Sequence, residues 1–296
     1  MKFDSPESFR TALLDRVKNR SLSTVGSSTD MDSLLKITAS ERFLARLVVN
    51  DDRWVLKGGL NLLARLGPGA RLTRDADVAT GIARSEIEER VRDAADRDLD
   101  DFLMFQVRPP VALQADCDEG GMRFRIHCLL AGTELATFNL DVVLLEPAAS
   151  DVQDVTLPDF LAFAGVPPVT VPALRPGRQA IEKLHAYTRH YASGANQRPR
   201  DLVDMLALAV VTPFSASELR SVGTAVFSER ARQPWPPPLD SPPSAWAAYW
   251  DGEGRARHGL PNVDLAGAFD LLSRFWTPVL DASHVETWRP SMWAWH

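Results

Sequence analysis

Long apolar runs are missing from this sequence of 296 residues. A helix that crosses a bilayer needs about 20 consecutive apolar residues, and no stretch of the chain provides them. The first residues, Met1 to Ser8, also lack the apolar core of a signal peptide. We therefore expect a cytoplasmic protein that makes no use of a membrane.

Cysteine is scarce, and the spacing of Cys117 and Cys128 fits no metal-binding motif. So few cysteines suit a reducing compartment and exclude a fold built on disulfides. An excess of basic charge is absent too, because the formal net charge is −6 at pH 7. This balance excludes a general affinity for nucleic acid, so any such binding would need a local basic patch.

The sequence does contain a dense segment between Trp54 and Ala79. A short apolar run of strand character, residues 54–56, leads into Lys57-Gly58-Gly59. Apolar residues then recur at helical spacing from Leu60 to Leu66, which predicts a helix whose first N–H groups could bind an anion. Glycines here would let the backbone approach a ligand closely.

Asp75 and Asp77 follow on a second strand-like run. Residues two apart on a strand face the same way, so the two carboxylates should repel each other unless a cation lies between them. Paired carboxylates suit Mg²⁺, above all when phosphates complete its shell. Gly-Gly marks many ordinary turns and Asp-x-Asp is common. Their combination with Lys57 nevertheless favours a site for a metal and a phosphate.

A third aspartate, Asp141, interrupts the apolar run from Phe138 to Leu144. Burying a carboxylate is costly unless it is paired or binds a metal. Asp141 is therefore a candidate third ligand beside the other two aspartates. The alternative is a residue that faces solvent from an edge strand.

The rest of the chain predicts an α+β protein with a mainly helical C-terminal half. Strand-like runs cover residues 102–107, 122–130 and 135–145, and helical patterns cover 6–19, 31–49, 177–191, 198–211 and 264–279. The proline-rich residues 158–176 are interpreted as a linker. These features predict two domains, residues 1–157 and 158–296.

The start of the second half is locally basic. Its positive residues are Arg175, Arg178, Lys183, Arg189, Arg198 and Arg200. Such a segment could contact nucleic acid, and for that role we single out Arg175, Arg178, Arg189 and Arg198. The alternative is a helix face that is simply solvated.

The order of these motifs resembles the AbiEii-type nucleotidyltransferase toxins of type IV toxin–antitoxin systems, which include the MenT group. The resemblance covers roughly Met31 to Val211 and is most specific at Lys57-Gly58-Gly59 and at residues 71–77. It implies a nucleotidyltransferase domain of the DNA polymerase β type, with a mixed sheet, followed by a helical domain. The helical domain would bring Lys183 near the carboxylates.

The resemblance also implies residue roles. It assigns nucleotide binding to Gly58, Gly59, Thr73, Lys183 and Arg200, metal binding to Asp75 and Asp77, and catalytic roles to both aspartates and to Lys57, Lys183, Asp201 and Asp141. Asp204 lies one helical turn after Asp201, and Asp141 matches a third carboxylate of the wider superfamily. Leu60 replaces the small hydroxyl residue that usually follows the two glycines.

The implied activity is Mg²⁺-dependent transfer of a nucleotide from a nucleoside triphosphate (NTP) to the 3′ end of tRNA. Such a transfer would block aminoacylation and hence translation, and an AbiEi-type antitoxin would be encoded nearby. Two alternatives remain open. One is a nucleotidyltransferase that modifies a small molecule or a protein side chain (AMPylation). The other is an inactive nucleotide-binding module, with which Leu60 would agree.

Overall fold

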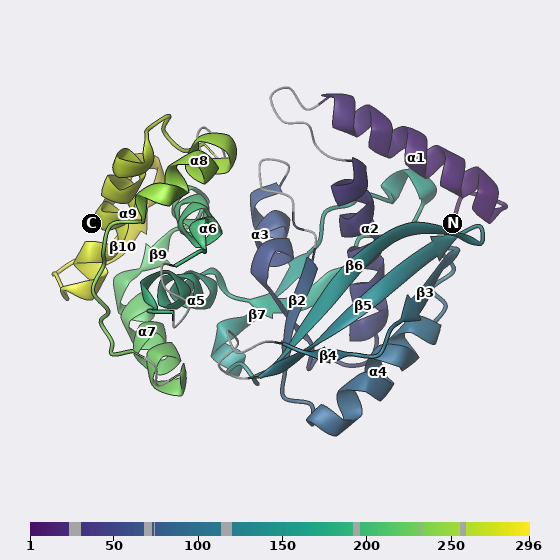
Figure 1. Ribbon diagram of the computed structural model, residues 1–296, viewed down its shortest axis with the longest axis horizontal. Coiled ribbons are helices and arrows are strands. Elements are labelled where there is room, and N and C mark those ends of the chain that lie inside the picture. The colour runs from purple at the N-terminus through teal and green to yellow at the C-terminus, as the bar shows by residue number, and fades with distance from the viewer. Residues whose placement is uncertain are drawn as a thin grey trace. The chain divides into compact units, whose positions relative to one another are not determined.

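The computed structural model describes residues 1–23, 31–67, 73, 75–113, 120–191, 196–230, 233–254 and 259–296. The described residues up to Leu174 form one compact unit and those from Arg175 onward form a second. The first unit is built on a mixed sheet and the second is mainly helical (Figure 1). The predicted α+β class is confirmed. No helix among the described residues is both long and apolar enough to span a membrane.

The sheet of the first unit combines parallel and antiparallel pairs. Its strands are β1 (Val55–Lys57), β2 (Asp75–Thr80), β3 (Leu103–Val107), β4 (Val111–Ala112), β5 (Gly121–Leu130), β6 (Thr133–Leu144), β7 (Val152–Thr156) and β8 (Thr170–Leu174). They are arranged in the order β3-β5-β6-β2-β1-β8-β7, with β4 beside β5. β2 runs parallel to β6, and β1 runs parallel to β8. The two aspartates of β2 are thus placed in the middle of the sheet.

Helix α2 (Met31–Val48) covers the apolar face of this sheet. The ring of Phe43 lies 5.3 Å from that of Phe105 and 6.0 Å from that of Phe138. Leu140 and Val142 on the same face of β6 are fully buried. Because strand side chains alternate, the polar residues between them must lie on the opposite face. The remaining helices of the unit are α1 (Pro6–Ser23), α3 (Gly58–Leu66) and α4 (Arg84–Asp96).

The interpretation of residues 158–176 as a linker was wrong. β8 lies in this segment and pairs with β1 on one side and β7 on the other. Both pairings are long-range, so the local abundance of proline gave no sign of them. Since β8 belongs to the sheet, we propose that the first domain extends to Leu174 and does not end at residue 157.

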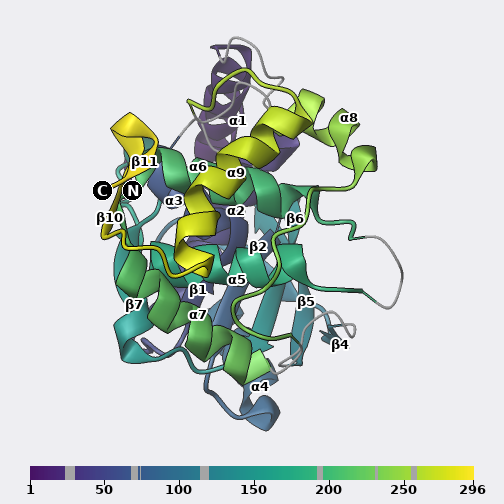
Figure 2. The ribbon, with the colours of Figure 1, turned by 90° about the vertical axis from the view of Figure 1, so that its left-hand side faces the viewer.

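The second unit is a helical bundle with a small antiparallel sheet. Its elements are α5 (Pro176–Thr188), α6 (Pro199–Val211), α7 (Ala216–Arg230), α8 (Ala247–Tyr249), α9 (Leu265–Leu280), β9 (Phe214–Ser215), β10 (Thr287–Arg289) and β11 (Ala294–Trp295). α5 packs on α6 and α7, and α9 packs on the same two helices (Figure 2). The C-terminal segment packs back on the bundle. Trp288 is fully buried and donates its Nε1–H to the carbonyl of Ala209 over 2.7 Å.

Candidate active site

Four charged residues line up across neighbouring strands on the polar face of the sheet. Lys57 on β1 lies opposite Asp77 on β2, and Asp77 lies opposite Asp141 on β6. Asp141 in turn lies opposite Arg123 on β5. Directly opposed residues share a face, so Lys57, Asp77, Asp141 and Arg123 form one line, here called the charged row. The sheet thereby joins three predicted site residues with one, Arg123, that sequence reasoning missed.

Asp75 lies on the same face as Asp77, two residues earlier in β2. Asn139, its neighbour on β6, donates from Nδ2 to Oδ1 of Asp75 over 3.0 Å. Thr73 donates its hydroxyl to the backbone carbonyl of Asp75 over 3.0 Å. The contact with Asn139 orients the carboxylate, and the contact with Thr73 holds the backbone at the start of β2. Asn139 was also missed, although its position two residues before Asp141 places it on the same face.

The N-terminus of α3 lies directly against Asp77. Gly58 has φ +66°, a left-handed value that favours glycine. A Cβ atom on Gly58 would come within 2.0 Å of Asp77 Oδ2, so any larger residue would displace this carboxylate. Gly59 is the second residue of α3, and Lys57 occupies its N-cap position. The first N–H groups of a helix lack partners within the helix and attract anions, so this end of α3 suits a phosphate beside a metal-binding carboxylate.

Asp141 is engaged by an arginine. Arg123 donates from Nε to Oδ1 over 2.7 Å and from Nη2 to Oδ2 over 2.6 Å. The hydrogen bonds to Asp141 raise the pKa of the Arg123 guanidinium, and the charges of Asp75 and Asp77 raise it further. The guanidinium therefore remains charged and offsets part of the repulsion among the three carboxylates. Alternation of Arg123 and Arg125 with apolar residues on one strand was the available sequence signal.

In the second unit, Lys183 on α5 bridges two acidic residues of α6. Its Nζ lies 2.8 Å from Asp201 Oδ1 and 2.9 Å from Asp204 Oδ2, and both aspartates are buried. Arg198 binds the other oxygen of Asp201 over 2.9 Å, and the charge of Asp201 raises the pKa of Arg198. The second group of predicted site residues is therefore one connected network. Its proximity to the charged row stays a prediction.

The basic segment contains one residue that does not suit its predicted role. Arg178 is only 2% exposed, because its guanidinium lies against Glu182 and forms two hydrogen bonds with Glu229. A side chain held in this way is not available to a nucleic acid, and we remove it from the proposed patch. Arg175, Arg198 and Arg200 are exposed, and Arg189 is partly exposed with its guanidinium over the ring of Tyr191.

Within the described part of the chain, no group of three or more His, Cys, Asp and Glu side chains is arranged to hold a metal ion. A metal at this site would therefore rest on Asp75 and Asp77 together with oxygens of a ligand. Cys128 has no part in such chemistry, since burial raises the pKa of its thiol to about 12. Cys117 lies outside the described residues.

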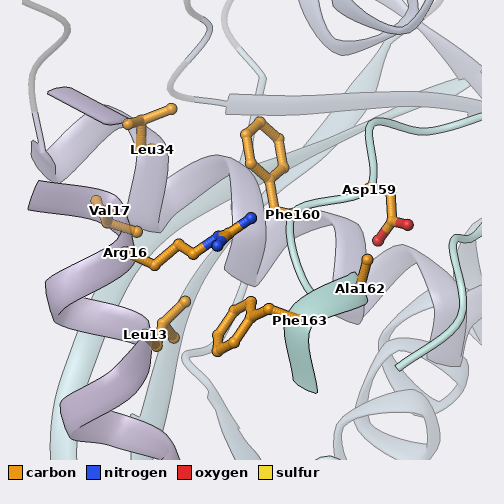
Figure 3. A pocket seen from close by; sticks show the side chains of 8 residues that line it. All are labelled: Leu13, Arg16, Val17, Leu34, Asp159, Phe160, Ala162 and Phe163. Atoms are coloured by element: carbon orange, nitrogen blue, oxygen red, sulfur yellow. The ribbon is translucent and has the colours of Figure 1, made fainter. Parts of the chain in front are cut away.

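A cavity of about 50 Å³ lies elsewhere in the first unit. It is lined by residues of α1, α2 and the segment 159–163, and Figure 3 shows Arg16 reaching from α1 toward Phe160 and Phe163. The guanidinium of Arg16 lies 5.5 Å from the centre of the Phe163 ring. None of the lining residues belongs to the charged row, and we assign the cavity no ligand.

Sequence comparison places these motifs in a known family. The model of the nucleotidyl transferase AbiEii toxin of type IV toxin–antitoxin systems matches residues 42–262. This chain belongs to the AbiEii family. It is accordingly a nucleotidyltransferase of a toxin family whose systems include an antitoxin partner. The match covers both units, and it includes the charged row and the network around Lys183.

The fold of this AbiEii family member is similar to that of MenT4, a nucleotidyltransferase toxin from Mycobacterium tuberculosis H37Rv. The two share 20% identity and a TM-score of 0.57, with 78% of each chain covered. JHP933 from Helicobacter pylori matches with 16% identity and a TM-score of 0.41, over 67% of this chain and 75% of its own. None of the curated proteins matches the sequence.

Proposed function

We propose that this chain is a Mg²⁺-dependent toxin that transfers a nucleotide from an NTP to the 3′ end of tRNA. The transfer would block aminoacylation and thereby translation. The observation that carries the proposal is the placement of Asp75 and Asp77 on one face of β2, with Asp77 against the N-terminus of α3. Binding of an NTP requires both features. The helix N-terminus would bind its phosphates, and the carboxylates would bind the metal that accompanies them.

The residues present fit a magnesium ion. Asp75 and Asp77 are both partly exposed, and Asn139 orients the first of them. Two carboxylates plus phosphate oxygens and water are a typical set of ligands for Mg²⁺. When bound, the ion would neutralise charge on the phosphates during transfer. The absence of a Cβ at Gly58 leaves room for Asp77 in this arrangement.

The other residues of the site would bind and position the NTP. The first N–H groups of α3, at Gly58 and Gly59, would donate to phosphate oxygens, and Lys57 would add a positive charge beside them. From the second unit, Lys183 and Arg200 would supply further cations. Asp201 would act by holding Lys183 in place, as the distance of 2.8 Å between the two side chains suggests.

For the acceptor, the proposal relies on a local patch of Arg189 and Arg198, which both lie beside Tyr191, and on Arg175 at the other end of α5. A chain with a net charge of −6 can recruit a polyanion only through such a patch. We place the activity in the cytoplasm, where NTP and tRNA are both present. An AbiEi-type antitoxin encoded nearby would be the natural partner of this toxin.

The proposal can be tested by incubating the pure protein with Mg²⁺, total tRNA and each labelled NTP in turn. We expect label to enter RNA from one or two of the four NTPs and to map to the 3′ end. Asp77→Ala should abolish the transfer while leaving the circular dichroism spectrum unchanged. The matched control is Asp98→Ala, which removes an exposed carboxylate in the same unit.

Three outcomes would contradict the proposal. Label that enters the protein itself, with none in RNA, would favour AMPylation. Full activity of Asp77→Ala with Mg²⁺ would show that the metal site has been misplaced. Binding of NTP with no transfer to RNA, protein or small molecules would favour a nucleotide-binding module.

A further inference from the structure

We infer that Asp141 acts by positioning Arg123 and that Arg123 binds a phosphate of the NTP. Asp141 is then not a metal ligand. This inference rests on the proposed nucleotidyl transfer and deepens it by adding Arg123 to the residues that hold the substrate.

The contact between the two side chains is bidentate. Nε and Nη2 of Arg123 each donate to a different oxygen of Asp141, over 2.7 and 2.6 Å. Paired, charged hydrogen bonds of this kind are among the strongest in proteins and fix the plane of the guanidinium. Each oxygen of Asp141 therefore already accepts a short hydrogen bond from the arginine, and this pairing, rather than metal binding, is the role assigned to Asp141.

Burial distinguishes the two partners. The side chain of Asp141 is 12% exposed, whereas that of Arg123 is 43% exposed. The Asp141 carboxylate is thus mostly buried, whereas the Arg123 side chain is accessible to solvent. A guanidinium has five N–H donors, and the pair with Asp141 uses one edge of it. With 43% of its side chain exposed, Arg123 is suited to bind a second anion.

The position of Arg123 identifies that anion as a phosphate of the NTP. Arg123 belongs to the charged row, which also contains Asp77 and Lys57. A triphosphate that begins at the N-terminus of α3, at the Lys57 end of this row, would extend along the row past Asp77 toward Arg123, which lies two strands beyond Asp77. Arginine matches phosphate geometry with two parallel hydrogen bonds, which lysine cannot do.

The test measures equilibrium binding of a fluorescent, non-hydrolysable NTP analogue to the full chain, without any RNA. Arg123→Ala and Asp141→Asn should each weaken binding by roughly 10-fold, about the effect of losing one charged hydrogen bond. Arg123→Lys should recover part of the loss. Arg125→Ala is the matched control, because Arg125 lies on the same face of β5 and opposite Asn139. It should bind within about twofold of the wild type.

Arg123→Ala leaves a buried carboxylate unpaired and could unfold the sheet. The double variant Arg123→Gln/Asp141→Asn removes both charges together and keeps similar shapes. If the two residues act as a unit, the double variant should bind the analogue no more weakly than Arg123→Ala. The Mg²⁺ concentration for half-maximal transfer should stay the same in Asp141→Asn and increase strongly in Asp75→Asn.

Three results would overturn the inference. An Asp141→Asn variant that needs at least roughly 10-fold more Mg²⁺ would make Asp141 a metal ligand. Unchanged binding of the analogue in Arg123→Ala would exclude a contact between Arg123 and the NTP. A change of tRNA affinity in Arg123→Ala without a change in NTP affinity would exclude it as well. Because the binding assay contains no RNA, a failure of the tRNA proposal would leave the expected binding pattern intact. The two failures are therefore distinguishable.

Discussion

Gly58 is the residue on which the geometry of the candidate site depends most directly. Its positive φ and its closeness to Asp77 are two separate constraints, and both exclude a side chain. The first concerns the backbone, since left-handed conformations cost other residues roughly 1–2 kcal/mol. The second concerns the carboxylate, which would have to move to admit a Cβ. Glycine is thus needed here for a structural and a chemical reason together.

Gly58→Ala should therefore lose activity as well as stability. We expect nucleotidyl transfer to decrease roughly 100-fold, because a displacement of about 1 Å in a catalytic group has this effect. Thermal unfolding and the transfer assay measure the two losses separately. The control is Gly132→Ala, since Gly132 also has a positive φ but a Cβ there would meet nothing within 4 Å. Equal effects of both substitutions on activity would argue against a special role for the contact with Asp77.

At the scale of elements, buried ion pairs connect helices and strands in each unit. Arg46 of α2 is fully buried and binds both oxygens of Asp101, at the start of β3, over 2.9 and 2.6 Å. It also donates to the backbone carbonyls of Arg42, Arg97 and Leu103. All five of its N–H groups therefore have partners, which offsets the cost of burying the charge.

Arg46→Met should destabilise the protein by about 3–5 kcal/mol, because it leaves the buried Asp101 carboxylate with Arg42 as its cation and, besides it, the backbone N–H of Leu103. Urea denaturation measures this change. Arg92→Met is the control, since Arg92 forms an exposed pair with Glu88 on α4. It should change the free energy of unfolding by less than about 1 kcal/mol. Similar losses in both variants would contradict a special role for the buried pair.

The same pair predicts how stability depends on pH. Burial by itself raises the pKa of Asp101, but the hydrogen bonds and charges of Arg46 and Arg42 outweigh it and lower the pKa below its ordinary value. The unfolded chain then binds the proton more readily, so the stabilisation is complete above about pH 4 and is lost as pH falls through the folded pKa. In Arg46→Met the contributions of Arg46 are lost while the burial remains, so the pKa of Asp101 in the folded protein should rise, and melting temperatures measured from pH 7 downward should fall less steeply with pH than in the wild type.

The network in the second unit affects how mutations at Lys183 should be interpreted. Lys183 connects α5 to α6 through two buried carboxylates, so its removal should destabilise the bundle by about 3 kcal/mol besides removing a cation from the site. We expect Lys183→Met to lower both the melting temperature and the activity.

The variant Lys183→Arg keeps the charge and should restore the melting temperature. A loss of activity in Lys183→Arg at unchanged stability would then measure a contact with the NTP. A wild-type melting temperature in Lys183→Met would contradict the structural role.

At the scale of the whole molecule, charge is distributed unevenly along an acidic chain. The first residues of the second unit, from 175 to 200, contain the exposed Arg175, Arg198 and Arg200 and the partly exposed Arg189. Phosphate contacts release counterions, so the affinity of a patch for RNA should fall as the salt concentration increases. This dependence separates a binding patch from a face that is merely solvated.

Arg189→Glu should weaken tRNA binding and reduce the slope of log Kd against log salt by about 1, because one phosphate contact is lost. Filter binding between 50 and 200 mM salt, chosen to span the range where such contacts weaken, measures both quantities. Arg84→Glu reverses an exposed charge on α4 and controls for the change in net charge. If both substitutions changed tRNA affinity equally, Arg189 would belong to a solvated surface with no specific role in RNA binding.

The sequence by itself determined the features that depend on neighbours along the chain. Strand alternation places Asp75 and Asp77 on one face whatever lies beside β2. The glycines and the helical spacing after Lys57 likewise predicted the end of α3 that lies against Asp77. These motifs were also sufficient to indicate the family, since their order along the chain carries the resemblance.

Only the tertiary structure decided which distant residues meet. The pairing of β5 with β6 brings Arg123 to Asp141, and the pairing of β2 with β6 brings Asn139 to Asp75. Likewise, the packing of α5 on α7 turns Arg178 from a candidate surface cation into a buried partner of Glu229. Each of these contacts depends on which element lies beside which. That choice is made by the burial of apolar faces across the whole unit, and local spacing carries no information about it.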